Sequence, residues 1–391
     1  MTDFDVASML DEARGATGLD DFGADDFREP LGVAARSLGT EPRLSPAGRA
    51  GERAGIVGHL TQRLLLEEWI KRYPPILDEH VGDPVVIVGL PRTGTTMLYR
   101  MLSVSTGLTA PLHYEARRPT PPLDWDFDRA TDPRVAEADA AIAAMNAAAP
   151  ELVSIYPFEA LAPEEDIFIS AASFRTTSTQ SGARVPSFEA WLAAADRVPL
   201  YRFLKRNLQL LQWQRRRTNP PVEPARWLLK TPDHLHGLDA LLTVWPGAKV
   251  IQTHRDPLQT IPSICSFIRT LHSLATDDVD DVGIGDAWSS MFARSTERAM
   301  TVRDGRPEQF CDIWYDDTVH APRKAADEVF AFLGRSLDDD AWAEMERWRD
   351  GNRREARPAH AYTLEQFGLS PDRVEREFAA YRERFILPER A

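Results

Sequence analysis

The segment from Val85 to Leu102, VVIVGLPRTGTTMLYRML, constrains the fold of this chain more than any other. An apolar run reaches Gly89, a second glycine follows at position 94, and a helical pattern begins after it. Strand, glycine loop and helix in this order are typical of a phosphate-binding loop, whose backbone N–H groups surround an anion. The triphosphate-binding form carries a lysine directly after its second glycine, where this chain has Thr95. The segment therefore predicts a phosphate-binding loop without the lysine for a terminal phosphate.

Strand-like and helix-like segments alternate through most of the remaining chain. Strand patterns followed by amphipathic helices recur at RWLLK (226–230), AKVIQTH (248–254) and FCDIWY (310–315), with a shorter one near Thr109. This order predicts an α/β fold of the P-loop type, with three layers, α/β/α, and a mostly parallel central sheet of about five strands. Residues 1–80 are predicted as a helical N-terminal layer, and residues 81–391 as the α/β domain with a helical insertion at about 130–218. Three segments, 149–166, 177–191 and 277–286, are interpreted as loops, the first two as breaks in the helical insertion.

Charge and composition restrict the partners of the chain. It has 46 Lys and Arg against 60 Asp and Glu, a net charge of −14, so its overall field repels nucleic acid. No run approaches the ~20 apolar residues of a membrane span, and the first residues carry acids where a secretory signal carries bases. Only Cys265 and Cys311 occur, which argues against a disulfide framework or a zinc site. We therefore expect a cytoplasmic protein without an integral membrane segment.

Distinctive residues follow three of the predicted strands, and the carboxyl ends of parallel strands meet at one edge of a sheet. The loop residues Thr93, Gly94, Thr95 and Thr96 offer hydroxyl and backbone donors at a helix N-terminus, and Arg92 adds a fixed charge. Lys230 ends the second of these strands. Arg255 follows the third, and Ser263 lies on the helix that begins there, so both could bind a second phosphate. This edge is predicted to hold the ligand.

These motifs together resemble the sulfotransferase family, whose donor is 3′-phosphoadenosine 5′-phosphosulfate (PAPS). The likeness begins near Val85 and covers most of the chain from there: PRTGTT resembles the 5′-phosphosulfate loop of the family, and RDPLQTIPS its 3′-phosphate motif. The late segment IWYDDTVHAPRKAADEVFAFLG resembles a further family segment. The resemblance implies a PAPS-dependent sulfotransferase that binds the donor through Arg92, Thr93, Gly94, Thr95, Thr96, Arg255 and Ser263. No predicted strand ends in an aspartate that would hold magnesium, so Arg92 and Lys230 are expected to replace a metal ion.

The general base is the least determined part of the prediction. Cytosolic sulfotransferases carry a Lys-Thr-His tripeptide, and this chain has Lys230 followed by Thr231 and Pro232, so the lysine matches and the base histidine does not. In other branches a glutamate after the first crossover helix is the base, and Glu115 in LHYEARRP occupies the comparable place. We therefore predict Glu115 as the base, with His234 and His113 as rivals.

The acceptor is expected to be a small molecule with a hydroxyl or an amine, and assembly into a homo-oligomer stays open. The insertion at 130–218 could form an apolar acceptor pocket, although a helical core has the same composition. Two other function classes compete with sulfuryl transfer. A P-loop nucleotide kinase or phosphotransferase would need the missing lysine and a metal-holding aspartate. A non-catalytic anion-binding module would leave the conjunction of Lys230, Arg92 and Glu115 unexplained.

Overall fold

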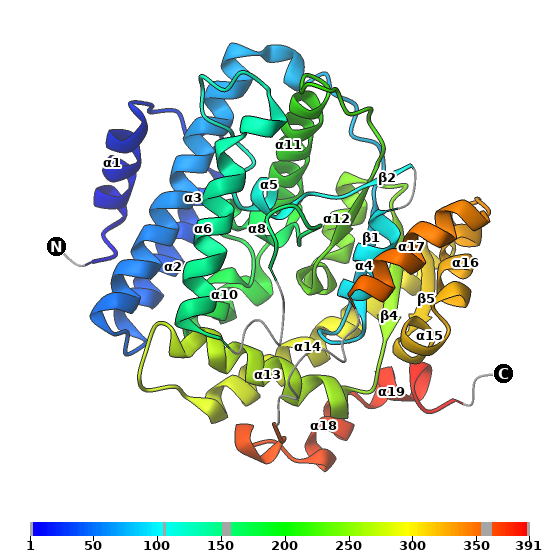
Figure 1. The fold of residues 1–391 in the computed structure, drawn as a ribbon. Helices are drawn as coiled ribbons and strands as arrows, with labels where there is room; N and C mark the ends of the chain where they lie inside the picture. The colour runs from blue at the N-terminus through cyan, green and yellow to red at the C-terminus, as the bar shows by residue number, and fades with distance from the viewer. Residues whose placement is uncertain (1–2, 105–106, 151–157, 353–361, 389–391) are drawn as a thin grey trace.

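The computed structural model describes residues 3–104, 107–150, 158–352 and 362–388, and a parallel sheet forms the centre of this part of the chain (Figure 1). Its five strands lie in the order β2-β3-β1-β4-β5, and every neighbouring pair is parallel. Their bounds are β1 Val85–Gly89, β2 Leu108–Thr109, β3 Arg226–Lys230, β4 Lys249–His254 and β5 Phe310–Trp314. The predicted fold class, including a mostly parallel sheet of about five strands, is confirmed.

The central strand β1 is buried on both faces and alternates its side chains between two helical layers. Val85 and Ile87 pack in a core with α4, α16 and α17, whereas Val86 and Val88 pack in a core with α11 to α14. The first layer consists of α4 Thr95–Ser103, α16 Pro322–Phe332 and α17 Asp339–Gly351. The second consists of α11 Val198–Arg215, α12 Leu238–Val244, α13 Pro257–Ser273 and α14 Asp281–Asp304. The result is the three-layer α/β/α arrangement.

The chain order reverses at β1, whose neighbours β3 and β4 both come later in the sequence. A crevice opens beyond the carboxyl ends of the strands at such a point, and ligands bind there. The register places the end of β1 beside the ends of both neighbours, since Ile87 pairs with Lys230 and Gly89 with Thr253. The loop after β1, Lys230 and the start of α13 therefore meet at one edge.

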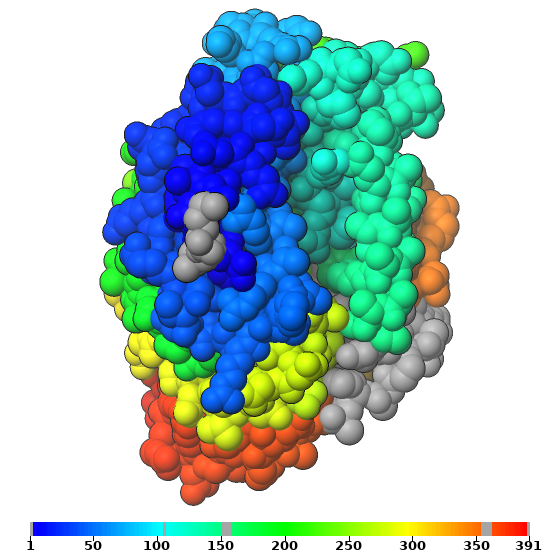
Figure 2. Space-filling model, turned by 90° about the vertical axis from the view of Figure 1, so that its left-hand side faces the viewer, coloured from blue at the N-terminus to red at the C-terminus, as the bar shows by residue number. Residues whose placement is uncertain are grey.

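The helices that precede the sheet pack on the segment between β2 and β3. They are α1 Val6–Thr17, α2 Arg28–Thr40 and α3 Pro46–Arg72. Ser45 caps α3 by accepting a hydrogen bond from the Gly48 N–H, and Pro46 occupies its first turn. Their hydrophobic core also contains side chains from around α10, among them Phe188 and Leu192. Figure 2 shows a hollow in the surface between these blue helices and the teal segment around α6.

The segment between β2 and β3 is mainly helical. It contains α5 His113–Arg117, α6 Pro133–Ala148, α8 Ile167–Ser170, α9 Ser178–Gly182, α10 Pro186–Ala194 and α11. Two predicted loops are wrong in part: residues 177–191 form α9 and most of α10, and the acidic segment 277–286 contains the start of α14. In both cases a polar or proline residue begins a helix, since Pro186 stands in the first turn of α10 and Asp280 caps α14.

The described part of the chain ends with short helices beside β5 and α14. They are α15 Tyr315–His320, α18 Pro371–Glu377 and α19 Ala379–Phe385. Within the described residues, none of the helices is both long and apolar enough to cross a membrane.

Candidate active site

The loop between β1 and α4 adopts a left-handed turn that opens its backbone toward the carboxyl edge. Arg92 has φ 70° and Gly94 has φ 85°, and α4 begins at the next residue, Thr95. The first N–H groups of a helix have no partner within the helix and carry partial positive charge. A β-carbon on Gly94 would only touch the Tyr315 ring, at 3.4 Å, so it is the positive φ of the turn that favours glycine here. The loop therefore leads through a left-handed turn into the N-terminus of α4, and its use as an anion site stays a prediction.

A buried pair of hydroxyls fixes this loop to β4. Thr93 Oγ1 donates to the Leu90 carbonyl at 2.7 Å and lies 2.6 Å from Thr253 Oγ1. A β-carbon on Gly89 would lie 2.3 Å from the same Thr253 oxygen, so only glycine permits this approach. The Thr93 hydroxyl was predicted as a ligand group, and the structure uses it to hold the loop in place. Its backbone remains part of the turn.

Arg255 joins the second predicted donor-binding segment to the loop. Its Nη1 donates to the Arg92 carbonyl at 3.0 Å, and its guanidinium lies over the Tyr315 ring, 3.8 Å from the centroid. Gln259, one turn along α13, accepts from Arg255 Nε at 2.9 Å. Ser263 is buried on the same helix. The two motifs that carried the family resemblance thus lie in direct contact.

Lys230 brings a buried ammonium to the first turn of α4. Its side chain is fully buried, and Nζ donates to Thr96 Oγ1 at 3.2 Å and to Glu165 Oε1 at 2.5 Å. The Tyr99 ring lies 5.6 Å from the same nitrogen. The prediction placed Lys230 beside the loop and did not include Glu165.

Three consecutive acids, Glu164, Glu165 and Asp166, lie at the carboxyl edge. Glu164 pairs with His113, whose Nδ1 is 2.8 Å from Oε2, and Asp166 pairs with His234, whose Nε2 is 3.2 Å from Oδ2. Asp166 also accepts the Lys230 backbone N–H at 3.0 Å. Sequence reasoning interpreted this stretch only as a break in the helical insertion. The signal that could have found it is the run of three acids after Pro163 and before an apolar helix.

His234 and His113 are both held inside polar networks. Besides Asp166, His234 contacts the Tyr201 hydroxyl through Nδ1 at 3.2 Å, so both ring nitrogens have partners. Both histidines are buried. Both therefore serve to orient the acidic stretch in this structure.

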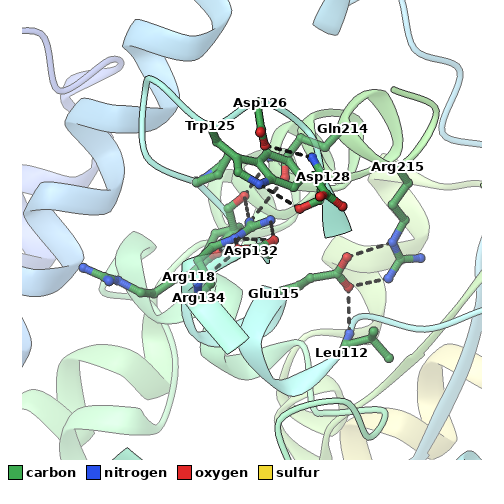
Figure 3. A network of polar contacts seen from close by, with 12 residues as sticks. Leu112, Glu115, Arg118, Trp125, Asp126, Asp128, Asp132, Arg134, Gln214 and Arg215 are labelled. Carbon is green, nitrogen blue, oxygen red and sulfur yellow. Dashed lines mark hydrogen bonds and ion pairs between the residues drawn. The ribbon is translucent and has the colours of Figure 1, made fainter. Parts of the chain in front are cut away.

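The predicted base, Glu115, belongs to a different network, which Figure 3 shows. Arg215 on α11 donates two hydrogen bonds to its carboxylate, one of them from Nε to Oε1 at 2.9 Å. The Leu112 N–H donates to Oε2 at 2.9 Å. The remaining Arg215 donors bind the Thr109 hydroxyl and the Ala110 carbonyl. Glu115 lies within the short helix α5, after the crossover helix α4, and Arg215 holds its carboxylate.

The pKa values of the two glutamates shift in opposite directions. Burial raises the pKa of Glu115, but the charge and hydrogen bonds of Arg215 outweigh it, and the net pKa lies below the ordinary value. Burial also raises the pKa of Glu165, and here the opposing charge of Lys230 does not outweigh it, in part because Glu164 and Asp166 are acidic neighbours. Glu115 is thus held as a carboxylate, whereas Glu165 binds a proton more readily than an ordinary glutamate.

A cavity of about 200 Å³ lies beside Glu115 rather than beside the loop. Its walls include Glu115, Arg215, Trp125 and Arg134, and its lining contains neither Lys230 nor a residue of the phosphate-binding loop. For this reason we place the candidate active site at the carboxyl edge, where the loop and the cations converge, and not in this cavity. No cluster of three His, Cys, Asp or Glu side chains suited to a metal ion occurs within the described ranges.

Comparisons of the sequence and of the structure with known proteins find relatives of one kind. A family model described as "Sulfotransferase family" matches residues 84–339. Two curated relatives, the omega-hydroxy-beta-dihydromenaquinone-9 sulfotransferases Stf3 of Mycobacterium bovis and Mycobacterium tuberculosis, are 26% identical over 265 residues. The match spans 64% of this chain and 62% of the length of those relatives.

Two solved structures resemble almost the whole chain. The sulfotransferase STF1 from Mycobacterium tuberculosis H37Rv has a TM-score of 0.83 and 30% identity, with 96% of this chain and 98% of that chain covered. The sulfotransferase STF9 from Mycobacterium avium has a TM-score of 0.87 and 27% identity, with 98% and 97% covered. The likeness therefore extends beyond the sheet to the helices that precede it.

Proposed function

The chain belongs to the sulfotransferase family, and from this premise we propose that it transfers the sulfuryl group of PAPS to a hydroxyl or an amine of a small molecule. The observation that carries the proposal is the 3.0 Å hydrogen bond from Arg255 to the Arg92 carbonyl. It joins the two segments expected to bind the 5′-phosphosulfate and the 3′-phosphate. A nucleotide with phosphate groups on the 3′ and 5′ positions of its ribose suits two adjoining anion sites.

In the proposed reaction the acceptor oxygen or nitrogen forms a bond to sulfur, and the bond from sulfur to the 5′-phosphate oxygen breaks. The electron pair of that bond stays on the phosphate oxygen, so the 5′-phosphate of the leaving adenosine 3′,5′-bisphosphate (PAP) carries one more negative charge than it did in PAPS, and the acceptor gives up its proton. Lys230 and Arg92, with the N-terminus of α4, supply positive charge for this oxygen. Because the chain provides these cations, we propose a transfer that needs no metal ion.

We propose a hydroxyl on an apolar molecule as the first acceptor to test. Phe158 and Phe168 flank His113, with ring centroids 5.4 and 6.5 Å away, and offer apolar surface beside the acidic stretch. The Stf3 relatives are named for a hydroxylated dihydromenaquinone. A panel of 2-naphthol, a hydroxylated dihydromenaquinone and an aliphatic amine covers these chemistries. A cytoplasmic location and a homo-oligomer remain predictions.

Calorimetry with PAP tests the donor site. Arg255→Ala should weaken PAP binding by roughly 2–3 kcal/mol, about 30- to 150-fold, because a charge-assisted hydrogen bond is lost. Arg269→Ala is the matched control, since Arg269 lies on α13, the helix that begins just after Arg255, and its side chain is exposed and paired with Asp281. This variant should bind PAP like the wild type.

Two results would contradict the proposed function. The first is equal affinity of the wild type for PAP and for 5′-AMP, because the 3′-phosphate would then have no binding site. The second is transfer of phosphate from ATP, dependent on magnesium, with no transfer of label from sulfur-labelled PAPS to any member of the panel.

A further inference from the structure

The three acids from Glu164 to Asp166 differ in how their side chains are held. The side chains of Glu164 and Asp166 are 1% and 0% exposed, and each faces a histidine. The Glu165 side chain is 19% exposed and contacts Lys230. The two outer acids therefore fix the backbone, and the middle carboxylate is the one that remains partly exposed.

The backbone of this stretch is anchored on both sides. The Glu164 N–H donates to the Pro111 carbonyl at 2.9 Å, and Leu112 and Pro163 form an antiparallel bridge. The Asp166 carboxylate accepts the Lys230 N–H at the end of β3. Glu165 thus lies on an anchored segment rather than on a mobile loop. A side chain that must meet a reacting atom requires such a rigid support.

The Lys230 ammonium places Glu165 next to the phosphate-binding loop. One nitrogen contacts both Thr96 in the first turn of α4 and Glu165 Oε1. An acceptor that attacks a sulfuryl group held by this turn must approach through the same region. The incoming hydroxyl needs a proton acceptor close to the sulfuryl group, and a carboxylate in this region can take that proton.

Resting on the proposed function, we propose that Glu165 is the general base of the transfer. The acceptor oxygen forms its bond to sulfur while its proton moves to a Glu165 carboxylate oxygen, and the sulfur–oxygen bond to PAP breaks. Lys230 pairs with Glu165 in the free chain and turns toward the phosphosulfate when the donor binds. The donor thereby removes the positive charge that lowers the basicity of Glu165, so the base becomes stronger when the donor is present.

The competing assignment, Glu115, has the opposite environment. Its side chain is 4% exposed, and Arg215 and the Leu112 N–H occupy both of its oxygens. A carboxylate held this way stays ionised and accepts a proton poorly. Glu115 and Glu165 therefore form a matched pair of variants, with the same residue type changed in two different networks.

The test compares Glu165→Gln with Glu115→Gln in the full chain. With the member of the acceptor panel that the wild type sulfates best, Glu165→Gln should lower kcat roughly 10²- to 10⁴-fold, the usual contribution of a positioned base. Its Tm should fall, because the buried Lys230 loses its counter-charge, so kcat is compared at a temperature where the variant is folded. Its PAP affinity should be equal or tighter. Wild-type kcat should rise with pH through one ionisation that is missing in Glu165→Gln.

Calorimetry of PAP binding in two buffers of different ionisation enthalpy gives a second measurement that needs no acceptor. If Lys230 turns from Glu165 to the bound donor, the pKa of Glu165 rises. Wild type and Glu115→Gln should then take up more protons on binding PAP than Glu165→Gln does. Near-normal kcat in Glu165→Gln, with unchanged proton uptake, would overturn the assignment. Failure of the wild type to bind PAP or to use any acceptor would instead overturn the proposed function itself.

Discussion

Replacing Glu115 by glutamine tests whether this residue stabilises the folded protein or takes part in the reaction. The structure gives its carboxylate three hydrogen bonds, two from Arg215 and one from the Leu112 N–H. An amide keeps the shape of the side chain, but only one of its two ends accepts hydrogen bonds. In Glu115→Gln the NH₂ group must therefore face a donor, and Arg215 loses its counter-charge while it remains 13% exposed.

The expected cost follows from this burial. Removing one partner of a buried ion pair destabilises a protein by about 3 kcal/mol or more. For 391 residues the entropy of unfolding is about 0.8 kcal/mol/K, so this loss lowers Tm by about 4 °C. We expect PAP affinity and kcat to change little at temperatures where the variant is folded.

The pH dependence provides a second check on the same pair. The net pKa of Glu115 is lowered on folding, so its pairing stabilises the protein above about pH 4.5, the ordinary value, and that stability is lost as pH falls through the folded pKa. Urea unfolding of wild type and variant should therefore differ by about 3 kcal/mol at pH 7. The difference should shrink below pH 4.5.

One result would refute this reasoning. If Glu115→Gln unfolds like the wild type and binds PAP normally, yet loses kcat by roughly 10²- to 10⁴-fold, Glu115 acts as the base that its position in the sequence suggested. Equal stability differences at pH 7 and pH 3 would also contradict it, because the unfolded glutamate binds a proton below pH 4.5 and the advantage of the ion pair must shrink there.

Further predictions concern the loop and the charge at the site. Gly89→Ala should lower Tm and weaken PAP binding, at a cost of roughly 1–3 kcal/mol, since its methyl would meet Thr253. Gly58→Ala in α3, with open space around it, is the control. It should raise the free energy of unfolding by up to about 1 kcal/mol, and with it Tm. Sulfuryl transfer should survive EDTA, and loss of activity restored by magnesium would refute the role of Lys230 and Arg92.

The sequence by itself determined the fold and predicted where a donor site should lie, because both inferences depend on local patterns. A strand, a loop with glycines at 89 and 94, and a helix are specified by neighbouring residues, and β-strand alternation sorted the two faces of the sheet. Parallel strands bring their ends to one edge, so the order of the strand patterns was enough to place Lys230 and Arg255 beside the loop. Local helix-start signals were underestimated, as Pro186 in the first turn of α10 and Asp280 at the cap of α14 show.

Only the tertiary structure decided which carboxylate faces the loop. Glu115 meets Arg215 one hundred residues later, and Lys230 meets Glu165 from sixty-five residues earlier. Such pairings depend on how the helical segment between β2 and β3 crosses the sheet, and no local pattern encodes that crossing. The pKa of each acid follows from its burial and its charged neighbours, so the same side chain is held as a carboxylate at position 115 and binds a proton more readily than usual at position 165.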